Sequence, residues 1–286
     1  MKFSRAALVS AFALGLVCGG RAIKGQEAPE PALQQAIAGD WRAANAKSRD
    51  AARRPAEVLT FWGLTPGAVI LEVQPGGGYW TDILAPYARM TGGRYVATAA
   101  DLANPKLPDG ARKARAEFEA RLAAKPEVYG KLELVNWGAQ SAPLPTNSYD
   151  FILTARNVHG WLGAPGMVDK AMREFAAALK PGGTLAVEQH RAGPGPHDEK
   201  AATDTGYVSE AFVIERAEKA GLKLVAKSEM NANSKDTKDH PFGVWALPPT
   251  RTSVAYGSGQ PPNPKFDHSK YDAIGESDRM TLRFVK

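Results

Sequence analysis

An acid and three glycines lie close together in one stretch of the sequence, and these residue types are suited to holding a nucleoside-like ligand. Glu72 ends an apolar run entered at Pro66-Gly67, and Gly76, Gly77 and Gly78 follow it. Glycines adopt positive φ angles and let the backbone approach a ligand closely, and a helix that starts beside them presents unpaired N–H groups. The carboxylate is suited to hydrogen bonding with a cationic, amine-bearing ligand. The stretch therefore predicts a cofactor site at the carboxyl edge of a parallel sheet.

Two common classes of nucleotide site fit this stretch less well. The Gly-Lys-Ser/Thr ending of a phosphate-binding loop is missing, which argues against a nucleoside triphosphate. The dinucleotide pattern GxGxxG is met at Gly76 and Gly78, but Thr81 occupies its third position. A nicotinamide-dependent oxidoreductase is therefore a less favoured alternative.

A second group of side chains with chemical potential follows the apolar run 150–155. Asn157 and His159 leave the carboxyl end of this predicted strand, where side chains face a bound ligand. A histidine there is suited to remove a proton from an incoming nucleophile near neutral pH, and Asn157 is suited to orient that nucleophile. The alternative is that His159 is a structural hydrogen-bonding residue.

These residues need a sheet whose strands end at one edge, and the hydrophobic pattern predicts such a sheet. Short apolar runs alternate with amphipathic stretches, which is typical of a doubly wound α/β fold. We expect strands over 68–71, 94–99, 132–136, 150–155, 184–188, 222–228 and 280–284. We expect helices over 32–52, 55–63, 80–91, 109–124, 168–179 and 210–220.

Residues 1–22 have the pattern of a secretory signal peptide. Lys2 and Arg5 precede the apolar stretch 6–17, and small residues follow near 18–22. The apolar stretch is too short to favour a spanning helix, so we expect an exported, periplasmic or secreted protein with no stable membrane span in the mature chain. An uncleaved anchor is the alternative.

The mature chain is expected to carry little net charge and no cysteine. Removing the signal peptide removes three basic residues and no acid, so the formal charge falls from +6 to +3. No lysine or arginine run remains that suggests nucleic acid as a partner. Cys18 is the only cysteine, which excludes disulfides, cysteine nucleophiles and thiolate metal sites from the mature chain. The five histidines lack the helical spacing of metal ligands, so we expect no metal site.

The acid and the glycines resemble motif I of the class I S-adenosylmethionine-dependent methyltransferases, which is written Asp/Glu-x-Gly-x-Gly-x-Gly. This chain has Glu72, Gln74, Gly76 and Gly78 at these positions, so Gln74 replaces the first glycine.

A wider part of the sequence extends the resemblance. The string 71–87, together with Arg156-Asn157-Val158-His159, is similar to a bacterial group of predicted methyltransferases that carry export signals and often lack that glycine. The resemblance covers roughly residues 50–229 and resumes in the last ten or so.

The resemblance implies a Rossmann-like, seven-stranded sheet, mostly parallel, whose final strand runs antiparallel between the sheet's last two strands. It implies S-adenosylmethionine as the cofactor and methyl transfer to an unidentified small-molecule acceptor. Cofactor contacts are implied for Glu72, Gln74, Gly76, Gly77, Gly78, Tyr79, Asp101, Trp137, Gly138 and Ala139, and acceptor contacts for Asn157, His159 and His190. Asp101 is expected to hold the ribose hydroxyls and Trp137 to stack on adenine. A turn residue and a core residue, respectively, are the alternatives.

The chain divides into three predicted segments. A signal peptide over 1–22 precedes a linker with N-terminal helices over 23–64, and a methyltransferase-like domain over 65–286 carries an insertion over 230–277. A loop this long is either functional or disordered, and we expect it to carry aromatic residues over the active face. Because S-adenosylmethionine is made in the cytoplasm whereas the signal sequence directs export, a non-catalytic envelope binding protein on a methyltransferase scaffold is the alternative function.

Overall fold

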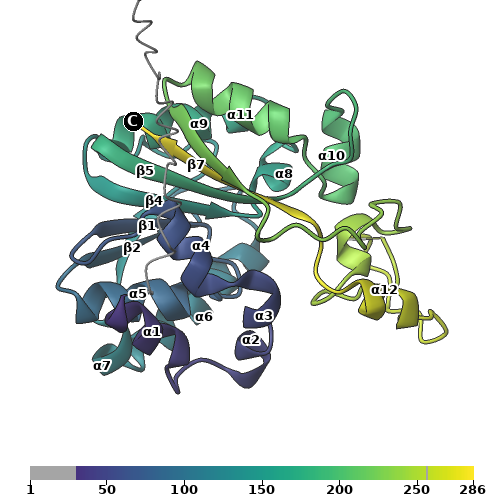
Figure 1. The fold of residues 1–286 in the computed structure, drawn as a ribbon, viewed down its shortest axis with the longest axis horizontal. Helices are drawn as coiled ribbons and strands as arrows, with labels where there is room; N and C mark the ends of the chain where they lie inside the picture. The colour runs from purple at the N-terminus through teal and green to yellow at the C-terminus, as the bar shows by residue number, and fades with distance from the viewer. Residues whose placement is uncertain (1–29, 256) are drawn as a thin grey trace, which may run out of the picture.

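Seven strands form one sheet in the order β3-β2-β1-β4-β5-β7-β6 (Figure 1). The computed structural model describes residues 30–255 and 257–286, so the predicted signal peptide over 1–22 lies outside the described residues. The strands are β1 (Val69–Val73), β2 (Arg94–Ala99), β3 (Glu133–Asn136), β4 (Tyr149–Ala155), β5 (Leu179–His190), β6 (Lys223–Ser228) and β7 (Arg279–Val285). Neighbouring strands are parallel except at β7, which runs antiparallel to both β5 and β6. This confirms the predicted fold class, including the place of the final strand.

Helices cover both faces of the sheet (Figure 1). Helices α9 and α11 share one apolar core with the strands, and α1, α4 and α5 share the other. The helices are α1 (Pro31–Ala38), α2 (Ala44–Lys47), α3 (Asp50–Arg53), α4 (Pro55–Trp62), α5 (Thr81–Met90), α6 (Asp109–Ala123), α7 (Pro126–Tyr129), α8 (Val158–Trp161), α9 (Met167–Ala178), α10 (Glu199–Thr205), α11 (Glu210–Lys219), the 3-10 helix η1 (Gly243–Ala246) and α12 (Ser269–Ile274). The molecule therefore has the three layers of a doubly wound fold.

The two cores follow from the alternation of side chains along the central strands. Leu71 and Val73 of β1 belong to the core beside α9, whereas Ile70 belongs to the core beside α5. Glu72 therefore lies on the α5 face of the sheet, which helices cover. A carboxylate on a covered face loses hydration, and functional carboxylates are often found in such positions.

The single helix predicted over 32–52 is wrong, because this segment forms the three short helices α1, α2 and α3. The break begins at Gly39, whose backbone is extended with ψ 136°. The ring of Trp41 fills the space beside Gly39, since an added Cβ there would lie 2.2 Å from a ring carbon. The Trp41 indole N–H donates a hydrogen bond to the Asp82 carbonyl of α5 (2.8 Å). Docking of the tryptophan onto α5 thus interrupts the helix.

Strand β5 begins earlier than the predicted 184–188, because it also includes residues 179–183. Leu179 already pairs with Tyr149 of β4, and the register then shifts between Tyr149 and Phe151. Strand β5 thus accommodates extra residues at this irregularity without ending.

Residues 229–278, between β6 and β7, form a projecting lobe that contains η1 and α12 (Figure 1). A buried carboxylate organises this lobe. Asp236 accepts hydrogen bonds from the Tyr207 hydroxyl (2.9 Å) and from the backbone N–H of Asp278 (2.8 Å), and its Oδ1 lies 2.8 Å from Nε2 of His240. These partners, with the backbone N–H of Lys238 (3.0 Å), fix the lobe against the end of the sheet.

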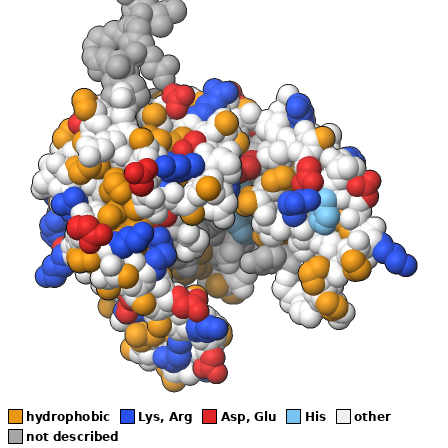
Figure 2. Space-filling model, turned by 90° about the horizontal axis from the view of Figure 1, so that it is seen from below, with side chains coloured by type: hydrophobic (Ala, Val, Ile, Leu, Met, Phe, Trp, Pro, Cys, Tyr) orange, Lys and Arg blue, Asp and Glu red, His pale blue; other side chains and the backbone are white. Residues whose placement is uncertain are grey.

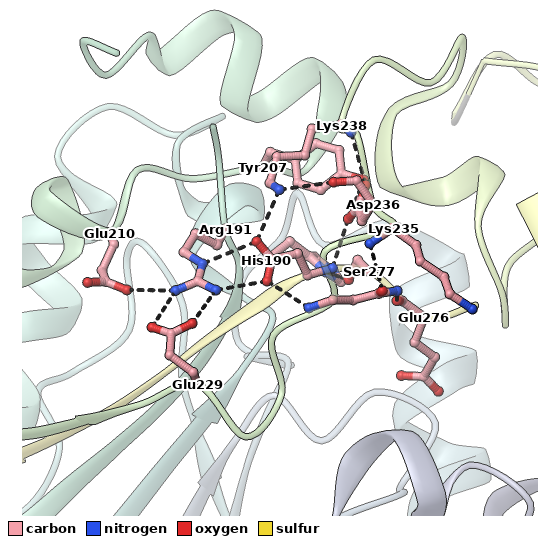
Figure 3. A network of polar contacts seen from close by, with 12 residues as sticks. His190, Arg191, Tyr207, Glu210, Glu229, Lys235, Asp236, Lys238, Glu276 and Ser277 are labelled. Atoms are coloured by element: carbon pink, nitrogen blue, oxygen red, sulfur yellow. Dashed lines mark hydrogen bonds and ion pairs between the residues drawn. The ribbon is translucent and has the colours of Figure 1, made fainter. Parts of the chain in front are cut away.

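Arg191, which directly follows β5, joins the two ends of the same lobe (Figure 3). Its guanidinium lies 2.6 Å from the carboxylate of Glu229 and 2.9 Å from that of Asp278. The first and last residues of the lobe are thus bound to one cation, which closes the loop at its base.

The surface mixes charges of both signs. On the face shown in Figure 2, basic and acidic side chains lie interspersed rather than gathered by sign. Within residues 30–255 and 257–286, no helix combines the length and the apolar composition needed to cross a bilayer.

Candidate functional site

Three adjoining cavities lie at the carboxyl edge of the sheet, next to the end of β1. The strand order reverses between β1 and β4, since the chain continues from β1 to β2 on one side and from β4 to β5 on the other. Gln74 and Pro75, directly after β1, line all three cavities. Doubly wound sheets bind their ligands at such a reversal.

The three cavities differ in the residues that form their walls. The N-terminal cavity, of about 570 Å³, is bounded by Asn45, Arg49, Glu72, Tyr79 and Arg156. The β2 cavity, of about 370 Å³, is bounded by Ala99, Ala100, Arg115 and Phe118. The histidine cavity, of about 360 Å³, is bounded by Asn157, His159, His190, Trp245 and Pro249.

The glycine stretch turns the chain from β1 into α5 through three residues in the left-handed region. Gln74 has φ +48°, Gly76 +59° and Gly78 +80°. An added Cβ on Gly78 would lie 2.3 Å from a guanidinium nitrogen of Arg121, so this glycine is close-packed. Gly77, by contrast, has open space where a Cβ would be and lines two cavities. The absence of a side chain there leaves room for a ligand.

Gln74 has the backbone conformation that a glycine adopts without strain, and for a glutamine this costs about 1 kcal/mol. Its side chain is fixed, because Oε1 accepts a hydrogen bond from the Trp161 indole N–H (2.8 Å). Its backbone N–H donates to Oγ1 of Thr98 on β2 (2.8 Å). The glutamine that replaces the motif glycine is therefore a fixed part of the wall where the three cavities meet.

Glu72 lines the N-terminal cavity but is only 3% exposed. Its Oε2 accepts hydrogen bonds from the Thr81 hydroxyl (2.8 Å) and the Tyr95 hydroxyl (2.6 Å). Burial raises the pKa of Glu72 to about 7, against the opposing effect of these two hydrogen bonds. The carboxyl group is thus partly protonated at neutral pH, and a cationic ligand beside it would favour the ionised form. Its predicted contact with an amine remains a prediction.

Tyr79 also lines the N-terminal cavity, but its hydroxyl already has a partner. It donates a hydrogen bond to Oδ1 of Asp50 (2.6 Å), and the guanidinium of Arg53 lies 4.4 Å from the ring centroid. Both partners belong to α3. Tyr79 therefore connects the N-terminal helices to the glycine stretch.

Asp101 lies outside the lining of all three cavities. Its carboxylate accepts a hydrogen bond from the backbone N–H of Ala103 (2.9 Å), which is the alternative turn role. The β2 cavity is lined instead by the end of β2 and by Phe118 of α6. Phe118 was not among the predicted cofactor contacts, although an aromatic residue on a highly charged helix could have indicated it.

The prediction that Trp137 stacks on adenine is wrong. Its indole is 2% exposed, donates a hydrogen bond to Glu174 (2.8 Å) and stacks on Phe175 with ring centroids 5.7 Å apart. Both partners belong to α9, so the ring faces the core beneath that helix. Gly138 and Ala139, which follow it, are also absent from the cavity walls.

Asn157 lies between the β2 cavity and the histidine cavity. Its side-chain amide donates hydrogen bonds to the Val73 carbonyl (2.7 Å) and to Oγ1 of Thr154 (3.3 Å). These bonds hold the end of β1 against the end of β4. The structure therefore shows a positioning role for Asn157.

His159 and His190 meet in the histidine cavity with ring centroids 5.7 Å apart. Nδ1 of His159 accepts from the Gln189 amide (3.2 Å), and Nδ1 of His190 lies 2.6 Å from the Ser277 hydroxyl. Burial lowers the pKa of His159 to about 4 and lowers the pKa of His190 well below its usual range. The expectation of a histidine that titrates near neutral pH is therefore wrong, because the lobe and the sheet desolvate both rings.

The projecting lobe supplies one wall of the histidine cavity through Val244, Trp245 and the segment 248–250. The ring of Trp245 lies against that of His159, with centroids 5.7 Å apart. An aromatic residue of the loop thus covers the site, as the sequence predicts. Among the described residues, no three His, Cys, Asp or Glu side chains are grouped so that they can hold a metal ion.

Comparison with known proteins shows what part of this chain is similar to. Residues 71–187 match a methyltransferase domain. The chain is 28% identical over 127 residues to the ubiquinone/menaquinone biosynthesis C-methyltransferase UbiE of Shewanella sediminis, and 30% identical over 128 residues to that of Escherichia coli O1:K1. Each alignment covers 44% of this chain and 43% of the relative, so the chain spans less than half the length of these curated relatives.

A comparison with solved structures supports the fold through one of the two similar chains described here. The [4+2]-cyclase SpnF superimposes with a TM-score of 0.51 at 16% identity, covering 89% of this chain and 91% of that one. A SAM-dependent methyltransferase from Aquifex aeolicus gives a TM-score of 0.45 at 24% identity, covering 64% of this chain and 86% of that one. The similarity to SpnF supports the fold alone. Its name, a cyclase, illustrates that the fold does not fix the reaction.

Proposed function

We propose that this chain transfers a methyl group from S-adenosylmethionine to a small-molecule acceptor bound in the histidine cavity. One observation carries the proposal: the methyltransferase-domain match over 71–187 contains the glycine stretch, the β2 cavity wall and the exit of β4. Residues within 71–187 that belong to different strands therefore meet at one cleft.

The cleft has the chemical character that this cofactor needs. The alanines and Phe118 of the β2 cavity offer apolar walls to a purine. Gly76 and Gly77 leave the backbone open to the ligand between the cavities. Glu72 in the N-terminal cavity is a carboxylate suited to the ammonium group of the cofactor.

The main task of the protein in methyl transfer is to align the two reactants. When bound, the sulfonium group supplies an electrophilic methyl, so the chain has to place a nucleophile in line with it and exclude water. His159 and His190 are neutral at physiological pH and weak as bases, since their pKa values are lowered by burial. They are therefore suited to orienting an acceptor by hydrogen bonds, and they favour an acceptor that needs little help to lose a proton.

A second candidate function is a non-catalytic binding protein on the same scaffold. It is favoured by Gln74, which occupies the place of a motif glycine and whose side chain is held by Trp161 where the cavities meet. A nicotinamide-dependent oxidoreductase is a third candidate, which Thr81 disfavours because it replaces the last glycine of the dinucleotide pattern.

Calorimetric titration of the chain with S-adenosylmethionine, S-adenosylhomocysteine and NAD separates the three candidates. The proposal expects saturable binding of the first two and none of NAD. Binding of no compound would favour the scaffold function, and binding of NAD alone would favour the oxidoreductase.

A substitution in the histidine cavity tests catalysis separately from binding. His159→Ala is expected to reduce the formation of S-adenosylhomocysteine in a bacterial small-molecule extract, with S-adenosylhomocysteine affinity changed less than about twofold. His197→Ala is the matched control, because His197 stacks on Phe212 outside the three cavities. Equal rates for the two variants would remove His159 from the acceptor site.

We propose further that residues 1–22 direct export, as in the bacterial group that the sequence resembles. The pattern of two basic residues, an apolar stretch and small residues supports this. Mass spectrometry of the N-terminus after expression in a bacterium, with cell fractionation, is expected to find the chain cleaved near residue 22 outside the cytoplasm. An intact chain in the cytoplasm would contradict export.

A further inference from the structure

Four guanidinium groups gather beside the N-terminal cavity, and two carboxylates lie among them. The cations belong to Arg49, Arg53, Arg156 and Arg279, and the carboxylates to Glu188 and Glu276. Within the described part of the chain, this group therefore has more positive than negative charge.

Glu276 is shared by three of the arginines. Its carboxylate lies 2.6 Å from Nε of Arg49, 3.1 Å from Nε of Arg53 and 2.7 Å from Nη1 of Arg279. The same Nη1 lies 2.9 Å from Glu188. Glu276 is thus shared among three arginines, whereas Oε1 of Glu188 has an ion pair with Arg279 but no hydrogen bond.

Several N–H groups of these arginines are buried without an acceptor. Among the residues that the structure places, no partner meets Nη2 of Arg49, Nη1 and Nη2 of Arg53, Nε of Arg156 or Nε of Arg279. Arg53 and Arg279 are each 1% exposed. Burying an unpaired donor costs free energy, and burying several beside a cavity is typical of a site that an anion completes.

Arg156 connects this group to the acceptor. It lines both the N-terminal cavity and the histidine cavity. Arg156 is the one charged side chain among the residues that bound the histidine cavity, since both histidines there are neutral. Burial, with Arg53 and Arg279 nearby, lowers the pKa of its guanidinium to about 9, against the opposing effect of Glu188 and Glu276. At neutral pH it is thus a cation, and no carboxylate lines the histidine cavity beside it, although Glu188 and Glu276 act on it from outside that cavity.

The charge of the cofactor adds to this imbalance. S-adenosylmethionine has a sulfonium, an ammonium and a carboxylate group, so it enters the cleft with a net positive charge. A second positive ligand would be repelled in this weakly hydrated site, whereas an anion would be attracted to it.

We propose that the methyl acceptor is an anion, with a carboxylate or phosphate group that binds Arg156 in the histidine cavity. This inference rests on the proposed function, because it names the class of molecule that the same site accepts. The planar guanidinium can donate two parallel hydrogen bonds to either group, which a single ammonium cannot.

Titration calorimetry with simple probes tests the inference. Benzoate, phenyl phosphate and the uncharged benzamide are titrated into the chain saturated with S-adenosylhomocysteine. We expect one or both anions to bind at least about tenfold more tightly than benzamide. Arg156→Gln is expected to weaken the binding of the anion about tenfold and to leave the affinity for benzamide unchanged, which removes the difference. Arg156→Lys is expected to retain part of the difference in affinity.

Controls separate binding from folding. Arg94→Gln is the matched control, since Arg94 is exposed, pairs with Glu133 on β3 and lies outside the cavities. Arg156→Gln should fold normally, because it removes a charge that has no ion pair. Circular dichroism and the affinity for S-adenosylhomocysteine check this.

Three results would overturn the inference. The first is equal affinity for benzoate, phenyl phosphate and benzamide. The second is an unchanged anion affinity in a folded Arg156→Gln chain. The third is anion binding that occurs only in competition with S-adenosylhomocysteine. The last result would assign the arginines to the carboxylate of the cofactor. Failure of S-adenosylhomocysteine itself to bind would refute the proposed function instead, and it is measured separately.

Discussion

Replacing Glu72 by Gln is expected to stabilise the chain above neutral pH. Glu72 is 3% exposed, and burial raises its pKa from 4.5 to about 7. The unfolded chain therefore releases this proton at a lower pH than the folded chain, so stability falls as the pH rises from about 4.5 to about 7 and stays reduced above it. The difference between the two pKa values corresponds to about 3 kcal/mol of unfolding free energy.

Glutamine removes this pH dependence because it does not ionise. Its amide oxygen can still accept the hydrogen bonds of Thr81 and Tyr95. Urea unfolding of both chains at pH 5 and pH 8 is the assay. The stability of the variant relative to the wild type is expected to be about 2 kcal/mol greater at pH 8 than at pH 5.

The exposed Glu117 of α6 provides the control, and Glu117→Gln is expected to show no such change between the two pH values. The same relative stability of Glu72→Gln at pH 5 and pH 8 would refute the argument from burial. If Glu72 holds the cofactor amine, the stabilised variant should also bind S-adenosylhomocysteine more weakly, which is the usual exchange between stability and function.

Two further substitutions test the strained turn and the lobe. Gln74→Ala keeps the left-handed backbone and loses the bond to Trp161, so it should cost about 1 kcal/mol of unfolding free energy, whereas Gln74→Gly also relieves the strain and should be nearly neutral. Equal urea midpoints for the two variants would show that the backbone is unstrained. Asp236→Asn weakens the acceptor for Tyr207 and His240, so we expect a loss of about 2 kcal/mol and faster protease cleavage within 229–278. Cleavage at the wild-type rate would mean that the carboxylate does not hold the lobe.

The sheet and the glycine turn could be predicted because their signals are local. Most strands are short apolar runs, and adjacent glycines mark the turn after Glu72. The place of β7 between β5 and β6 came from the resemblance, and the strand pairing confirms it. The methyltransferase-domain match likewise agrees with the predicted class.

The site side chains were harder to predict, because their environment depends on distant elements. Trp137 ends a strand, but the partner that turns its ring toward the core belongs to α9. The pKa of His159 depends on burial by neighbours such as Trp245, about 86 positions further along the chain. Asp101 follows its strand by two residues, and there a short turn uses its carboxylate.

The ion pairs around Glu276 have a consequence for how the molecule assembles. Arg49 and Arg53 reach this acid across 227 and 223 positions of the chain, and Glu276 lies just before β7. Contacts between such remote segments form slowly, since a long loop must close first. The glycine turn can thus exist in a growing polypeptide well before the arginine cluster does. The proposed anion binding should consequently be among the last properties that the protein acquires during folding.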